Sequence, residues 1–81
     1  MKAAILEDID RLVVREVEDY EVGKGEVLIR VKACAICGSD IRIMHHGNPR
    51  VKFPHIIGHE IAGVVVEVGE GVEKFEIGDR V

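Results

Sequence analysis

The sequence predicts a small, mainly β domain that contains a single short helix. Two observations support this prediction: apolar and β-branched residues recur with the two-residue period of strands, and glycines separate the apolar runs. Only one segment, residues 39–46, has the signals of a helix. We expect five or six strands that form a Greek-key barrel or sandwich. The barrel is expected to be incomplete, because residues 78–81 have the pattern of a strand that is just beginning.

Strands are expected at three runs of β-branched residues, 11–18, 26–34 and 61–68. In the second run, apolar residues alternate with Arg30 and Lys32, which is typical of a strand with one covered and one solvated face. The third run is rich in valine and contains Gly63. A glycine within a strand indicates a bulge or the close approach of a second backbone.

The helix is predicted to begin at Ser39, whose hydroxyl can cap the free backbone N–H groups of the first turn. Asp40 follows in that turn, where a carboxylate interacts favourably with the helix dipole. A Gly-Asn-Pro sequence at 47–49 ends the helix. His45 and His46 fall in the last turn, where a positive charge is mildly favourable. We interpret both as solvated surface residues.

The composition is typical of a soluble, globular chain. Of the 81 residues, 47% are hydrophobic and 32% are charged. The net charge of −4 argues against nucleic-acid binding, which requires a basic face. No apolar run is long enough for a signal-peptide core or a membrane span. We therefore expect a cytoplasmic protein without a membrane partner, in which thiols remain reduced.

Four residues of metal-binding type, Cys34, Cys37, His45 and His46, lie close together in the sequence. They lack the spacing of a zinc finger, because only seven residues separate Cys37 from His45. The adjacent histidines would also point about 100° apart on a helix. Cys34 continues the alternation of its strand, so we interpret it as a packing residue. A Cys-x-x-Cys redox motif stays open as an alternative, although such motifs usually open a helix in a thioredoxin-like context.

Cys37 is distinguished by its position directly before a Gly-Ser-Asp sequence, at a strand-to-helix junction. The free N–H groups and the dipole of a helix start lower the pKa of a thiol towards the thiolate, the form that binds zinc. A second polar group, His59 with Glu60, directly precedes the valine-rich strand, and Gly58 before it allows a tight backbone approach. An isolated His-Glu pair is usually a surface feature, but its combination with the Cys37 junction favours a joint site.

These residues resemble a known signature. Cys37-Gly-Ser-Asp40 followed by Gly58-His-Glu-Ile-Ala-Gly63, then Gly69 and Val72, is similar to the signature of zinc-containing alcohol dehydrogenases of the medium-chain dehydrogenase/reductase family. The segments VKACAICGSD, FPHIIGHEIAGVVVEVGEGV and IGDRV look like the amino-terminal, GroES-like catalytic domain of that family, in the right order along nearly the whole chain. The resemblance implies that residues 1–81 are the amino-terminal part of such a domain, a partial GroES-like β-barrel.

The resemblance also implies a role for each matched residue. Cys37 and His59 match two ligands of the catalytic zinc. Glu60 matches a carboxylate that lies beside the zinc or binds it intermittently. Asp40 matches the carboxylate that accepts the far ring N–H of His59 and so fixes the orientation of the ring. Ser39 matches the hydroxyl that binds the substrate alcohol and starts the release of its proton.

The implied reaction is the oxidation of a primary or secondary alcohol, or of a polyol. Zinc binds the alcohol and lowers its pKa, and the alkoxide transfers hydride to a nicotinamide cofactor. Some members have a histidine where this chain has Arg42, so either the proton relay ends at solvent or Arg42 contacts the cofactor phosphates. The Rossmann domain and the third zinc ligand would lie outside the 81 residues, and the missing domain sets the choice of NAD or NADP.

The resemblance further implies properties of the complete enzyme. It is expected to be a homodimer or homotetramer that acts on a small molecule, and the Cys-Gly-Ser-Asp form favours a branch similar to sorbitol or threonine dehydrogenases. The 81-residue chain alone is expected to be inactive. A free-standing GroES-like module that binds a partner or a metal without catalysis is the alternative. An open final strand argues against it, because an unpaired edge invites aggregation.

Overall fold

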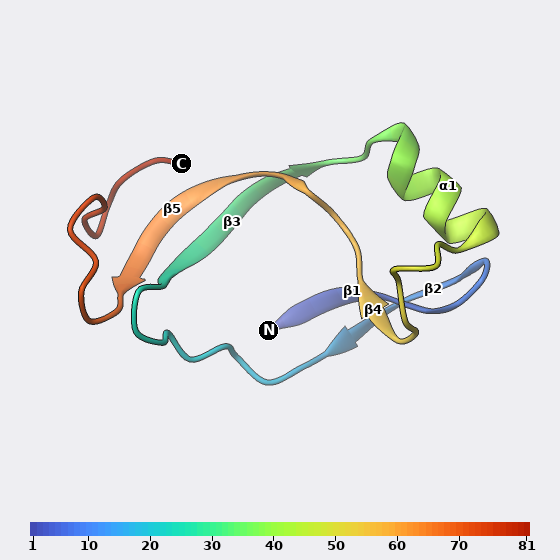
Figure 1. The fold of residues 1–81 in the computed structure, drawn as a ribbon, viewed down its shortest axis with the longest axis horizontal. Coiled ribbons are helices and arrows are strands. Elements are labelled where there is room, and N and C mark those ends of the chain that lie inside the picture. Colours follow the sequence, from blue (N-terminus) through green and yellow to red (C-terminus); the bar gives the residue numbers. More distant parts are fainter. The chain divides into compact units, whose positions relative to one another are not determined.

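The computed structural model describes residues 1–81, and Figure 1 shows them as a ribbon. In chain order the elements are β1 (Lys2–Asp8), β2 (Arg11–Glu16), β3 (Val27–Ala35), α1 (Gly38–His46), β4 (His55–Ile56) and β5 (Glu60–Val68). The prediction of a mainly β chain with one short helix is confirmed, and the five strands do not close into a barrel. The nine-residue helix is neither long nor apolar enough to cross a membrane.

Contacts divide the chain into two compact units. The first unit comprises Met1–Glu18 and Ala35–Glu60, and the second comprises Asp19–Cys34 and Ile61–Val81. The strands pair in two separate sheets, one of three strands and one of two. The residues of the candidate site all belong to the first unit.

The first unit is built on an antiparallel sheet with the strand order β2-β1-β4. Leu6 of β1 is fully buried in this unit. The turn between β1 and β2 includes Asp10, which has a φ of 57°. The backbone N–H of Asp10 donates to the carbonyl oxygen of Met44 at 2.7 Å, and its carboxylate contacts Nδ1 of His45. The hairpin turn is therefore tied to the last turn of α1.

The second unit contains β3 and β5, which pair in one sheet and run in opposite directions (Figure 1). The end of the chain also pairs with β5. Gly63 and Val81 exchange two backbone hydrogen bonds, of 2.8 and 3.0 Å, and Val64 forms an antiparallel bridge with Arg80. The strand expected at the end of the chain is therefore present as a short pairing.

Gly63 marks a close approach between the two strands of the second unit. A Cβ atom at this position would lie 2.4 Å from the carbonyl oxygen of Arg30 and 2.6 Å from Cγ2 of Ile29. Side-chain atoms do not pack this closely, so only glycine fits while β3 and β5 stay paired. The interpretation of this glycine as a point of backbone approach is confirmed.

Few side chains are buried: the buried hydrophobic residues are Ala3 and Leu6 in the first unit and Val65 in the second. The alternation along β3 predicts a covered apolar face, yet Ile29 and Val31 are 36% and 54% exposed. Cys34 is also exposed, so its interpretation as a packing residue is wrong. The reason is that β3 belongs to a two-stranded sheet, and its side chains are not covered within that unit.

Candidate metal centre

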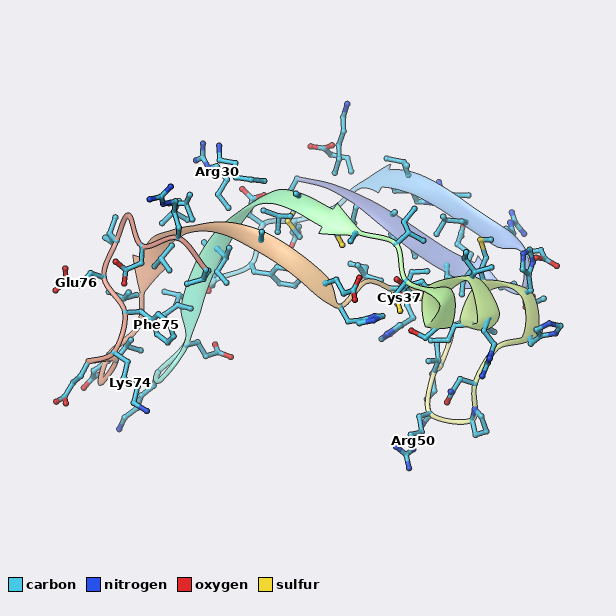
Figure 2. All side chains as sticks on the ribbon, turned by 90° about the horizontal axis from the view of Figure 1, so that it is seen from above. Arg30, Cys37, Arg50, Lys74, Phe75 and Glu76 are labelled. Carbon is cyan, nitrogen blue, oxygen red and sulfur yellow. The ribbon has the colours of Figure 1, made fainter.

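Cys37 lies at the junction where β3 has ended and α1 begins (Figure 2). Its backbone is extended, with φ −102° and ψ 158°, and it is the N-cap residue of the helix. The prediction that Ser39 caps the helix is therefore wrong, because Ser39 lies inside the first turn. The helix begins earlier because Oδ2 of Asp40 accepts a hydrogen bond from the backbone N–H of Cys37 at 3.1 Å, as in a capping box.

Asp40 is a buried polar residue whose side chain is only 8% exposed. While its Oδ2 atom accepts the N–H of Cys37, its Oδ1 atom lies 3.2 Å from Nδ1 of His59. One carboxylate thus holds two residues that are distant in sequence. Because Nδ1 of His59 faces Asp40, the Nε2 atom of the ring is the nitrogen left to bind a metal.

His59 and Glu60 are placed by a backbone turn and by the start of β5. Gly58 has a φ of 121°, a conformation that residues with a side chain rarely adopt. Glu60 is the first residue of β5, and both His59 and Glu60 are exposed. The turn at Gly58 brings this pair within reach of the start of α1.

The three candidate ligands form one cluster. The sulfur of Cys37, a ring nitrogen of His59 and a carboxylate oxygen of Glu60 all lie within 4.8 Å of one another. Zinc bonds of about 2.0–2.3 Å place ligand atoms about 3.3–3.8 Å apart, so a movement of at most about 1.5 Å would let the three atoms hold one ion. Thiolate, imidazole and carboxylate are also the ligand types that zinc prefers. The donor set and its spacing therefore fit a zinc ion.

Hydrogen bonds and nearby charges shift the pKa values of Cys37 and His59 in opposite directions. The hydroxyl of Ser39 lowers the pKa of the Cys37 thiol most, followed by a backbone hydrogen bond at Ser39 and a hydrogen bond with His59. Burial and the charge of Glu60 oppose this shift. The pKa of His59 is raised, first by its hydrogen bond with Cys37 and next by the charge of Asp40. The thiolate, which is the metal-binding form of cysteine, is therefore favoured.

The remaining residues of interest lie at different places on α1. Ser39 is adjacent to the cluster, and its hydroxyl donates to the sulfur of Cys37 at 3.5 Å. Arg42 is exposed on the helix. His45 contacts Asp10 at the opposite end of the helix, and His46 is exposed there. Neither of these histidines joins the ligand cluster.

Sequence reasoning missed the hydrogen bond between Asp40 and the backbone of Cys37. The available signal was the spacing, because Asp40 stands three residues after Cys37, the separation found in a capping box. Cysteine is not among the preferred N-cap residues, so the serine two positions later was the more obvious candidate.

These features define a class of protein, a β domain with a candidate zinc centre. In this centre Cys37, at the start of α1, meets His59 and Glu60, at the start of β5. More specifically, the chain belongs to the alcohol dehydrogenase GroES-like domain family, whose model matches residues 23–81. The resemblance to this family expected from the sequence motifs is confirmed.

Similar proteins include several dehydrogenases. The chain is 47% identical over 83 residues to an alcohol dehydrogenase of Geobacillus stearothermophilus, with 100% of this chain and 25% of that protein covered. It is 51% identical over 69 residues to the L-threonine 3-dehydrogenase of Pyrococcus horikoshii, with 82% of this chain and 20% of that protein covered. A crystal structure of the alcohol dehydrogenase RspB from Escherichia coli CFT073, complexed with NADH, matches with a TM-score of 0.89 and 43% identity, covering 100% of this chain and 23% of that one. The chain therefore spans at most about a quarter of the length of these relatives.

Proposed function

We propose that this chain is the amino-terminal part of the GroES-like catalytic domain of a longer, zinc-dependent dehydrogenase. The enzyme would oxidise a primary or secondary alcohol and pass the hydride to NAD or NADP. The observation that carries this proposal is the cluster of Cys37, His59 and Glu60, in which Asp40 contacts both Cys37 and His59. The similarity to an alcohol dehydrogenase and to a threonine 3-dehydrogenase supports an alcohol as the substrate class.

Cys37 and His59 are the proposed zinc ligands, with Glu60 as a further ligand or as a carboxylate beside the ion. When bound, zinc supplies Lewis-acid chemistry that lowers the pKa of a coordinated alcohol. Asp40 accepts the Nδ1–H of His59, which fixes the tautomer that leaves Nε2 for the metal. The same carboxylate accepts the backbone N–H of Cys37, so one buried group positions both ligands.

Ser39 and Arg42 are proposed to contact the two reactants. Ser39 is exposed beside Cys37 and would bind the hydroxyl of the substrate and receive its proton. Arg42 is exposed three residues further along α1 and would contact the phosphates of the cofactor, because a guanidinium group matches phosphate geometry. The remaining cofactor site is proposed to lie in a Rossmann domain of the longer chain, which the NADH complex of a relative supports.

The proposal extends to the complete enzyme, for which we infer a small alcohol or polyol as substrate, a cytoplasmic location and a homo-oligomeric state. The small size of the buried core supports the presence of further covering structure, because three buried hydrophobic residues are few for a self-sufficient domain. The relatives, which are about four times as long, have room for that structure and for a cofactor domain.

The test uses the complete protein that contains this domain. Zinc-loaded protein is assayed for reduction of NAD and of NADP with simple alcohols, polyols and threonine, alongside Cys37→Ala, His59→Ala and the matched control Cys34→Ala. We expect the first two variants to lose turnover and zinc, and the control to retain both, because Cys34 lies outside the cluster. Full activity in Cys37→Ala or His59→Ala, or no nicotinamide reduction with any alcohol, would overturn the proposal.

A further inference from the structure

The hydroxyl of Ser39 has a defined partner in the structure. Its Oγ atom lies 3.5 Å from the sulfur of Cys37 and donates a hydrogen bond to it. Ser39 is exposed in the first turn of α1, so its side chain is not forced towards the sulfur by surrounding packing. A hydroxyl carries one hydrogen and two acceptor lone pairs. When its hydrogen points at sulfur, only the lone pairs remain for a second partner.

The neighbouring side chains offer Ser39 few other acceptors. Arg42, one turn further along α1, is a guanidinium group that has only donors. The carboxylate of Asp40 is already used, since one oxygen accepts from the backbone of Cys37 and the other faces His59. Arg50, another cation of this unit, projects from its loop away from Cys37 (Figure 2). A carboxylate oxygen of Glu60 lies within 4.8 Å of the sulfur, but the hydrogen bond that the structure gives to the Ser39 hydroxyl is the one to sulfur.

We infer that Ser39 also donates to the Cys37 sulfur in the metal-loaded site and thereby weakens the donation of charge from this ligand to the metal. The inference rests on the proposed metal centre and adds a second role to Ser39. Hydrogen bonds to ligand sulfurs withdraw charge from them and are a general means of tuning a metal site. A metal that receives less charge from its thiolate is a stronger Lewis acid.

The direction of this hydrogen bond also sets how Ser39 meets the substrate. With its hydrogen directed to sulfur, Ser39 presents lone pairs to the reacting group. It can therefore accept a hydrogen bond from a substrate hydroxyl. When it receives the proton itself, its own hydrogen must leave the sulfur for a further acceptor such as water, so the hydrogen bond to sulfur belongs to the state before proton transfer. Ser39 is in this account a positioning residue for the sulfur and a direct contact for the substrate.

The experiment replaces zinc with Co²⁺, whose bond to a thiolate gives a sulfur-to-metal charge-transfer absorption band. The complete protein that contains this domain serves as the parent chain, and the part of the band that disappears in Cys37→Ser is assigned to this thiolate. Spectra are recorded for this parent chain and for Ser39→Ala, Ser39→Gly and Ser39→Thr. Circular dichroism of each protein checks that the strands and the helix are retained.

Loss of the hydroxyl should make the sulfur a stronger donor, so the band is expected to move to longer wavelength in Ser39→Ala and in Ser39→Gly. Ser39→Thr keeps a hydroxyl and should restore the position of the parent band. An unchanged band in both the alanine and glycine variants, or the same shift in the threonine variant, would overturn the inference while leaving the metal centre intact. Absence of a thiolate band in the parent chain would instead overturn the proposed centre and the inference together.

Discussion

The imidazole of His59 rests against the buried carboxylate of Asp40, with Nδ1 of the ring 3.2 Å from Oδ1. The second oxygen of this carboxylate accepts the backbone N–H of Cys37. A group that is 8% exposed therefore orients two side chains that are themselves accessible to a metal. Groups that hydrogen-bond to metal ligands in this way normally affect how tightly the metal is held.

Replacement of Asp40 by asparagine tests this arrangement. Asparagine keeps the size of the side chain but removes the charge that favours the Nδ1–H tautomer of His59. We expect Asp40→Asn to weaken zinc binding about 10–100-fold, the usual effect of losing a group that hydrogen-bonds to a metal ligand. Zinc affinity is measured by competition with a chelator. Glu67→Gln, which removes an exposed carboxylate from β5, serves as the control and should bind zinc like the parent. Normal affinity in Asp40→Asn would refute the positioning role.

The two cysteines provide a matched pair for identifying the ligand. We expect the 81-residue chain to bind zinc more weakly than a complete catalytic site, because it supplies two strong ligands, Cys37 and His59, where such sites hold the metal with three protein ligands. In a zinc series buffered by chelators, Cys37→Ser should abolish this binding, and Cys34→Ser should leave it unchanged, because Cys34 does not belong to the cluster. Equal losses in the two variants would contradict the assignment of Cys37 as the ligand.

The pH dependence of thiol reactivity should reveal the environment of Cys37. The lowered pKa of this thiol means that its thiolate persists to lower pH than that of an ordinary cysteine. In the metal-free Cys34→Ser chain, the rate of alkylation by iodoacetamide should therefore rise at a lower pH than the rate for free glutathione. Because the Ser39 hydroxyl is the largest cause of the shift, Ser39→Ala should move the midpoint upwards by more than His59→Gln does. A larger upward shift of the midpoint in His59→Gln than in Ser39→Ala would contradict the prediction that the Ser39 hydroxyl is the main cause of the lowered pKa.

The close approach of β3 and β5 makes Gly63 a sensitive position. An added methyl group would lie 2.4 Å from the carbonyl oxygen of Arg30, so the strands must separate to accommodate it. We expect Gly63→Ala to lower the free energy of unfolding by about 1–3 kcal/mol, the usual cost of overpacking. Gly38→Ala is the matched control, because a Cβ atom there meets nothing within 4 Å. Urea denaturation measures both variants, and equal stability of the two would contradict the close approach.

The sequence predicts well those elements whose burial follows a regular period or whose ends carry clear signals. β2, β3, β5 and the helix were all expected near their observed positions. β1 was not expected, because its buried residues, Ala3 and Leu6, are three positions apart and the pairing with β2 shifts register after Leu6. This spacing breaks the alternation that identifies a strand. β4 has only two residues and offers no pattern.

The candidate site shows a similar division between local and non-local information. Cys37, His59 and Glu60 could be selected from their positions next to a helix start and a glycine turn. The contact of Asp40 with His59 was implied only by the family resemblance, because it depends on how residues far apart in the sequence meet in space. The hydrogen bond of Asp40 to the backbone of Cys37 had a local signal, the three-residue spacing. The exposure of Cys34 was likewise missed, since an alternating pattern assumes that another layer covers the strand.

The central claim is that Cys37 and His59 bind a catalytic zinc. X-ray absorption at the zinc edge tests it most directly, using the zinc-loaded Cys34→Ser chain, in which Cys37 is the single thiol. We predict one sulfur neighbour at about 2.3 Å together with nitrogen or oxygen neighbours at about 2.0–2.2 Å. A zinc environment without sulfur, made only of nitrogen and oxygen, would contradict the account.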